Sequence, residues 1–232
     1  MARDSYTRYP RPILWLVQGG TITLGGDEED AQPCFEVEID SFYISKLPVT
    51  NEQLEAGVPS FSRSPLSPGD REPAVGVTYA IAQAYCDWYA GVSRKPMRLP
   101  SEIEWEYACR AGASGRWFCA EEQEVFDAHV WHAGNAGDGE RVPQLDAKKA
   151  NDFGLYGMLG GLWEWTSSPY RPYPLTASAA EGEPADSAVS ARVLRGGSFR
   201  VRGERISCSL RRAEQPSASD PDVGFRIVKS LR

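Results

Sequence analysis

The sequence lacks the long apolar run that a membrane-spanning helix requires, which is about 18–20 residues. The apolar stretch Ile13-Leu14-Trp15-Leu16-Val17 is much shorter and is followed by Gly19-Gly20. It is also shorter than the apolar region of a signal peptide and has no small-residue cleavage site after it. We therefore expect no membrane contact and a cytoplasmic location, and we interpret this stretch as a strand.

Residues that bind metals are also scarce. The chain has two histidines, His129 and His132, and five cysteines without C-x-x-C spacing, which are Cys34, Cys86, Cys109, Cys119 and Cys208. An odd, scattered set of thiols favours reduced, mostly buried side chains. These cysteines and histidines do not have the ligand spacings of zinc sites. We interpret the two histidines as surface or hydrogen-bonded side chains. We predict no metal site from these residues.

The chain has no long lysine-rich run, which makes nucleic acid an unlikely partner. Its net charge is −7, yet residues 192–232 contain ten Lys or Arg against four Asp or Glu. A basic end on an acidic body indicates either an anionic partner or arginines that pair with the acidic body. The sequence leaves both open.

No internal repeat and no linker divides the chain, so we predict a single α+β domain over residues 1–232. Residues 174–190 are small, acidic and of low complexity, which predicts a mobile insert. Regular structure is hard to identify beyond Gly112.

Local patterns predict the elements of the first half. Strands are expected within 13–24, at 35–39 and at 42–44. Thr50 and Gln53 form a capping box for a helix over 51–56, and Ser101 and Glu104 form one for a helix over 102–110, with Trp105, Ala108 and Cys109 facing the core. A longer helix is expected from Thr78 to Gly91, with one apolar face made of Ala80, Ile81, Ala84, Tyr85 and Trp88.

Several motifs follow one another in a fixed order. They are Val17-Gln18-Gly19-Gly20-Thr21-Ile22, the segments 42–51 and 98–108, Gly154-Leu155-Tyr156, Trp163-Glu164-Trp165-Thr166, Arg195-Gly196-Gly197-Ser198-Phe199 and Gly224-Phe225-Arg226. Together they resemble the formylglycine-generating enzyme, or sulfatase-modifying factor, family over about residues 17–228. The resemblance implies a C-type-lectin-like fold with two main helices, short sheets and many long loops. It also implies that most motif tryptophans and glycines have structural roles.

The family's enzymes oxidise a cysteine with oxygen and copper, using two cysteines just beyond the Gly-Gly-Ser-aromatic motif. In this chain Val201 stands at the first of these positions, and Cys208 stands alone. Copper is therefore not expected. Gly161 replaces an asparagine that the resemblance links to calcium, and Asn135, Asp138, Asn151 and Asp152 are interpreted as turn residues, although calcium stays possible.

A non-enzymatic branch of the family, the variable proteins of diversity-generating retroelements, displays variable residues between the Gly-Gly-Ser-aromatic and Gly-Phe-Arg motifs. In this chain that interval contains no asparagine and is rich in residue types that randomised adenines of an Asn codon can produce. Glu204, Glu214 and Gln215 are not of these types, and a GC-rich genome is the alternative explanation of the composition. The resemblance therefore implies a ligand-binding surface made of Arg200, Val201, Arg202, Arg205, Ser207, Leu210, Arg212, Ala213, Ser217, Ser219 and Asp220.

Three hypotheses remain. The preferred one is a non-catalytic domain that binds a protein or other macromolecule on this surface, with retroelement diversification. The second is a divergent oxidoreductase of the family, using Cys208 with Ser198. The third is a structural or regulatory domain of a larger assembly.

Overall fold

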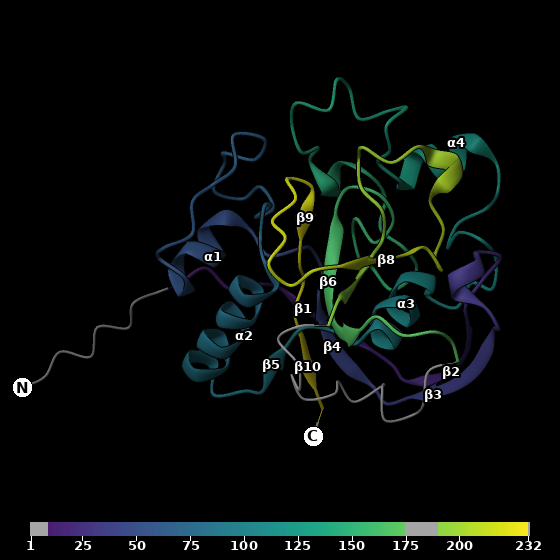
Figure 1. The fold of residues 1–232 in the computed structure, drawn as a ribbon, viewed down its shortest axis with the longest axis horizontal. Coiled ribbons are helices and arrows are strands. Elements are labelled where there is room, and N and C mark those ends of the chain that lie inside the picture. The colour runs from purple at the N-terminus through teal and green to yellow at the C-terminus, as the bar shows by residue number, and fades with distance from the viewer. Residues whose placement is uncertain (1–8, 175–189, 232) are drawn as a thin grey trace, which may run out of the picture.

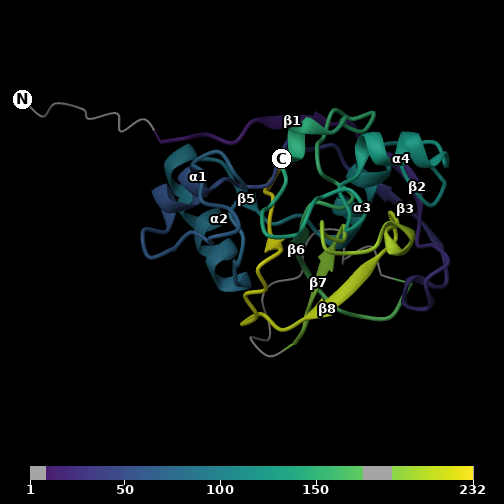
Figure 2. The same cartoon turned by 90° about the horizontal axis from the view of Figure 1, so that it is seen from above.

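The computed structural model describes residues 9–174 and 190–231. Almost all of the predicted insert at 174–190 lies outside these ranges. Figure 1 shows helices α1 (Asn51–Gly57) and α2 (Tyr79–Ser93) on one side of the central strands and α3 (Glu102–Arg110) on the other. Figure 2 confirms this separation from a second direction. No helix in the described ranges is long and apolar enough to cross a membrane.

Three antiparallel or mixed sheets form the framework. The first has the order β1-β4-β10-β5, with β1 at Leu14–Val17, β4 at Phe42–Ser45, β10 at Val228–Ser230 and β5 at Met97–Arg98. The second pairs β2 (Gly20–Leu24) with β3 (Phe35–Ile39). The third has the order β8-β7-β6-β9, with β8 at Arg211–Glu214, β7 at Arg192–Arg195, β6 at Trp163–Pro169 and β9 at Val223–Gly224.

The first-half predictions are largely confirmed. The predicted strands correspond to β1 to β4, and both capping boxes are present at the starts of α1 and α3. Trp105, Ala108 and Cys109 are fully buried. The 3-10 helix η1 (Glu29–Ala31) also lies in this half. The later part of the chain contains helix α4 (Gln123–His129) and the 3-10 helices η2 (Leu145–Ala147) and η4 (Gly203–Arg205).

Helix α2 differs from the prediction in its end and in its buried face. It continues past Gly91 to Ser93, and Arg94 closes it in the left-handed conformation at φ 53. Gly91 is exposed with open space around it, so it is tolerated inside the helix. The buried face consists of Ala82, Tyr85, Cys86 and Tyr89, whereas Ala80 and Ala84 are exposed.

The third sheet was not recognisable as regular structure in the sequence, although its motifs were. Strand β6 is buried on both faces over Trp163 to Thr166, so it shows no alternation of apolar and polar residues. Its parallel pairing with β9 places Glu164 opposite Gly224 and thereby joins two motifs that are far apart in the chain.

Buried ion pairs connect this sheet to α3. Arg195 pairs with Glu106, Arg211 binds Glu102 through two contacts of 2.8 Å, and all four side chains are inaccessible to solvent. Arg226 pairs in the same way with Glu164. These arginines of the basic end therefore pair with the acidic body of the fold, as one of the two interpretations of the charge distribution predicts.

Candidate ligand-binding surface

The segment that carries the predicted surface begins at a fixed point. After β7 the chain turns at Gly196 and Gly197, with φ of 100 and 74. A Cβ on Gly196 would lie 3.0 Å from the Met158 carbonyl oxygen and 3.1 Å from the Trp105 ring, so only glycine fits this turn. The Ser198 hydroxyl then donates a hydrogen bond to Asp222, and Phe199 is buried.

The segment also ends at a fixed point. Ser207 and Ser209 are buried, and both hydroxyls donate to the carboxylate of Glu28. Between them, the Cys208 backbone N–H donates to the Arg116 carbonyl oxygen at 2.8 Å. Burial raises the pKa of Glu28, but the two serine hydroxyls and nearby Arg116 outweigh it, and the net pKa lies below its ordinary value.

Residues 200–205 therefore run along the surface between two anchors and pack on a row of aromatic rings. The Trp117 and Phe126 ring centroids are 4.1 Å apart, and those of Phe126 and His132 are 5.4 Å apart. The Trp117 indole donates to the Ile206 carbonyl oxygen at 2.7 Å. Gly203 lies directly on these rings, because an added Cβ would be 3.2 Å from both Phe126 and His132.

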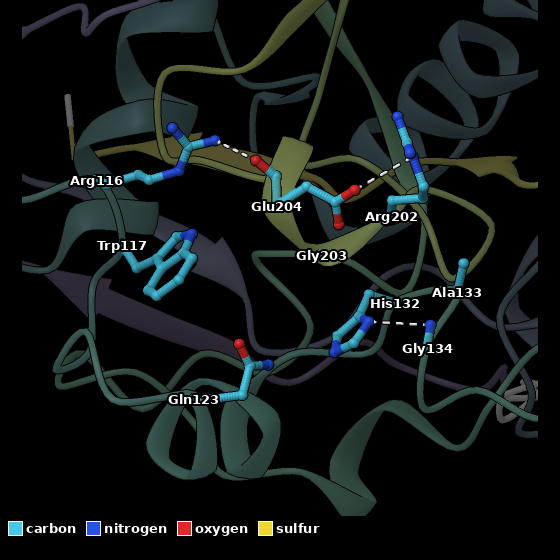
Figure 3. A pocket seen from close by; sticks show the side chains of 9 residues that line it. All are labelled: Arg116, Trp117, Gln123, His132, Ala133, Gly134, Arg202, Gly203 and Glu204. Carbon is cyan, nitrogen blue, oxygen red and sulfur yellow. Dashed lines mark hydrogen bonds and ion pairs between the residues drawn. The ribbon is translucent and has the colours of Figure 1, made fainter.

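A pocket of about 600 Å³ opens beside this segment (Figure 3). Arg116 donates to the Glu204 carbonyl oxygen at 2.7 Å, and Arg202 lies 3.3 Å from the Glu204 carboxylate. Trp117 and His132 supply aromatic surface to the same pocket. Its complete lining comes from Arg116, Trp117, Gln123, His132, Ala133, Gly134, Arg202, Gly203 and Glu204. The cavity therefore combines two guanidinium groups with flat apolar surface.

His132 is held in one orientation by two hydrogen bonds. Its Nδ1 accepts from the Gly134 N–H at 3.0 Å, so its Nε2 carries the proton and donates to Asp127 at 2.8 Å. This hydrogen bond is the main reason that the pKa of Asp127 lies below its ordinary value. The aromatic side of the pocket is therefore preorganised.

A second pocket, of about 650 Å³, borders the first. Arg200, Phe199, Leu66 and the turn at 137–140 line it, and Ala133 lines both pockets. Arg200 also donates to the Gly139 carbonyl oxygen at 3.1 Å. The two pockets therefore lie next to each other beside residues 199–204.

The structure divides the predicted surface residues into two groups at the two ends of β8. Arg200, Arg202 and Arg205 are exposed before β8, beside the pockets. Ala213, Ser217 and Ser219 are exposed on the end of β8 and the turns beyond it. Arg212 and Asp220, in this second group, are half-buried and form an ion pair with each other.

Three predicted residues point inward. Ser207 is 1% exposed and bonded to Glu28, so it cannot be part of an exposed surface. Val201 and Leu210 are half-buried and pack against core clusters. The prediction placed Ser207 on the surface by its residue type, whereas the hydrogen bonds that anchor residues 207–209 bury that stretch.

Sequence reasoning missed the residues opposite the segment. Arg116, Trp117, Gln123 and His132 come from the region after Gly112, where the sequence shows little pattern. Helix α4 has only seven residues and buries only Phe126, so it leaves no apolar periodicity to detect. Tertiary packing alone brings these side chains to the pocket.

The residues present do not fit copper at the family's position. The side chains of Val201 and of Ile206, five residues further on, contain only carbon and hydrogen and cannot bind copper. Cys208 is packed in the core, where its Sγ lies 3.8 Å from the Sγ of Cys109. The Ser198 hydroxyl donates to Asp222, and in the described residues no hydrogen bond joins it to Cys208.

The proposed turn residues make internal hydrogen bonds. The Asn151 amide donates to the carbonyl oxygens of Ala108 and Cys109 and accepts from the Phe153 and Leu155 N–H groups. Asn135 and Asp138 accept backbone N–H groups within their own turns. Across residues 9–174 and 190–231, no three His, Cys, Asp or Glu side chains are grouped so as to hold a metal ion.

Comparison with known proteins shows the family to which the chain belongs. The model of the sulfatase-modifying factor enzyme 1-like domain matches residues 3–231, and the chain belongs to this family. A curated relative, hercynine oxygenase of Mycolicibacterium smegmatis, is 33% identical over 92% of this chain and 60% of its own length. Serine/threonine-protein kinase pkn1 of Chlamydia pneumoniae is 30% identical over 96% of the chain but only 39% of its own length. The chain therefore spans roughly two fifths to three fifths of these relatives.

Solved structures show the same fold. PvdO from Pseudomonas aeruginosa superposes with a TM-score of 0.81 at 24% identity, covering 95% of each chain. Treponema denticola variable protein 1 superposes with a TM-score of 0.79 at 19% identity, covering 94% of each chain. The predicted α+β, formylglycine-generating-enzyme-like fold is confirmed.

Proposed function

We propose that this chain is a non-catalytic domain that binds a protein ligand through residues 199–205 and the two pockets beside them. The observation that carries the proposal is that Arg200, Arg202 and Arg205 are exposed on a segment held at both ends by hydrogen bonds from buried serine hydroxyls. A rigid scaffold that presents adaptable side chains lowers the entropic cost of binding.

The chemistry of the pockets favours an acidic partner. Arg202 is 70% exposed, and its contact with Glu204 at 3.3 Å lies on the surface, so it is available to a carboxylate. Arg116 adds a second guanidinium group to the same pocket, and Arg is enriched at protein interfaces. Trp117 and His132 would contact an apolar part of the same ligand.

A displayed random-peptide library selected against the wild-type chain tests this function. Enriched peptides should be rich in Asp and Glu and should bind at least tenfold more weakly to the triple variant Arg200→Ser, Arg202→Ser, Arg205→Ser. The matched control removes three exposed positive charges near α1 and α2, with Arg71→Ser, Arg94→Asn and Lys95→Ser. Equal loss in both variants, or no loss in either, would refute the assignment of this surface.

Retroelement diversification is a separate part of the proposal. It is tested by sequencing the coding region for residues 190–232 across a population of the source organism. If the segment is diversified, substitutions should occur at its exposed positions, and the buried stretch 206–209 should be constant. The exposed positions are Arg200, Arg202, Arg205, Ala213, Ser217 and Ser219. A uniform segment would remove diversification and leave the binding function standing.

A divergent oxidoreductase is the second candidate, and the contact between Cys109 and Cys208 is the observation that favours it. Soft sulfur ligands suit copper(I). Titration with copper(I) and a competing chelator tests it. Tight binding that is lost in Cys208→Ser would support an oxidoreductase, and binding unaffected by that change would exclude this thiol pair.

A further inference from the structure

Two cysteines that are far apart in the sequence meet in the core. Cys109 lies in the last turn of α3 and Cys208 lies between the two serines that bind Glu28. Their sulfur atoms are 3.8 Å apart, and both residues are fully buried in the same hydrophobic cluster. A disulfide has sulfur atoms about 2.05 Å apart, so less than about 2 Å of approach separates the thiol pair from a bond.

The two backbones are held in place independently of the sulfur atoms. The last turn of α3 is fixed by the Asn151 amide, which donates to the Cys109 carbonyl oxygen at 3.1 Å. The Cys208 N–H donates to Arg116, and its carbonyl oxygen accepts from Arg195 at 3.2 Å. Groups that are already positioned react with a high effective concentration. Cys86, by contrast, is buried in the other large cluster, away from this pair.

We propose that Cys109 and Cys208 form an intramolecular disulfide when the chain meets a low-molecular-weight disulfide oxidant. One thiolate attacks a sulfur of the oxidant, forms a mixed disulfide and releases one small thiolate. The second protein thiol, after losing its proton, attacks the protein sulfur of the mixed disulfide and releases the other small thiolate. Two protein thiols are oxidised by two electrons, and the oxidant is reduced to two thiols that take up the two protons.

The bond would link the end of α3 to the buried stretch 206–209 that follows residues 200–205, across 99 positions of sequence. Closing so long a loop restricts the unfolded chain and raises thermal stability. Burial raises the pKa of the Cys109 thiol well above its ordinary value, so the reaction of the closed native state is slow. Low concentrations of urea, which populate open states, should accelerate it.

The test incubates the full chain with oxidised glutathione, quenches with acid, alkylates under denaturing conditions and maps peptides by mass spectrometry. The expected product is one peptide pair linking Cys109 to Cys208, with Cys86 alkylated and exposed Cys34 carrying glutathione. Cys34→Ser and Cys119→Ser should retain the link, and Cys208→Ser should abolish it. Two outcomes would overturn the proposal. One is a disulfide between Cys208 and Cys119, and the other is a Cys208 thiol that is still free after Cys34 has reacted completely. The peptide map of the wild-type chain tests the proposal even if a variant fails to fold. Its result is also independent of whether the chain binds a ligand.

Discussion

Glu164 is the residue whose loss should destabilise the fold most clearly. It is fully buried, and its carboxylate accepts from Arg226 at 2.6 and 2.7 Å and from the Trp105 indole at 2.8 Å. Glu164→Gln keeps the volume but leaves the Arg226 charge buried without a counter-charge. Removing one partner of a buried pair costs about 3–5 kcal/mol. For a domain of this size each kcal/mol shifts Tm by about 2–4 °C, so a fall of about 6–20 °C is expected.

Thermal unfolding followed by circular dichroism measures this effect. Glu55→Gln is the control, because it breaks the partly exposed pair of Glu55 with Arg63 and should change Tm by only a few degrees. The double variant Glu164→Gln, Arg226→Met removes the isolated charge and should recover part of the loss. A fall for Glu164→Gln no larger than that of the control would refute the reasoning.

Three further predictions concern backbone and pH. Gly91→Ala should stabilise the chain by about 0.5–1 kcal/mol in urea unfolding, because Gly91 lies inside α2 with open space around it. Gly160→Ala should cost more than the about 1–2 kcal/mol of a left-handed conformation, since φ is +65 and the new Cβ would lie 1.8 Å from the Trp131 carbonyl oxygen. Glu28 has a lowered folded pKa, so its stabilisation is present above its ordinary value of 4.5 and is lost as pH falls through the folded value. Glu28→Gln should therefore be less stable than the wild type at pH 7, with the difference shrinking below pH 4.5; a constant difference would contradict this.

The sequence predicts those elements whose signals are local. Capping boxes at Thr50 and Ser101 satisfy their own helix ends, so both helices begin where the pattern indicates. The end of α2 was misplaced, because a glycine is a stop signal only where the chain turns, and Gly91 does not turn it. Strand β6 carries no alternation, because both of its faces are buried.

The candidate surface was predictable only in part, because residue type does not reveal burial in this segment. Cys208 and Ser207 have the composition of a variable surface and yet are buried, held by Cys109 and Glu28. Both partners lie about a hundred or more positions away, at sequence separations of 99 and 179. A single sequence contains no signal for such pairings.

The arginines of the carboxy-terminal region show why charge counts alone could not assign a function. Arg195, Arg211 and Arg226 each have a buried carboxylate partner from α3 or β6, so they contribute to the scaffold. Arg200 and Arg202 lie instead in the surface segment 200–205. Neither has a buried carboxylate partner among the described ion pairs. Because Arg200, Arg202 and Arg205 outnumber the single carboxylate of Glu204, an acidic ligand at residues 199–205 would meet a net positive charge. The affinity for an acidic ligand should therefore fall as the salt concentration rises, whereas the stability conferred by the buried ion pairs should change little. Measuring affinity and Tm across one salt titration would separate the surface arginines from the buried ones.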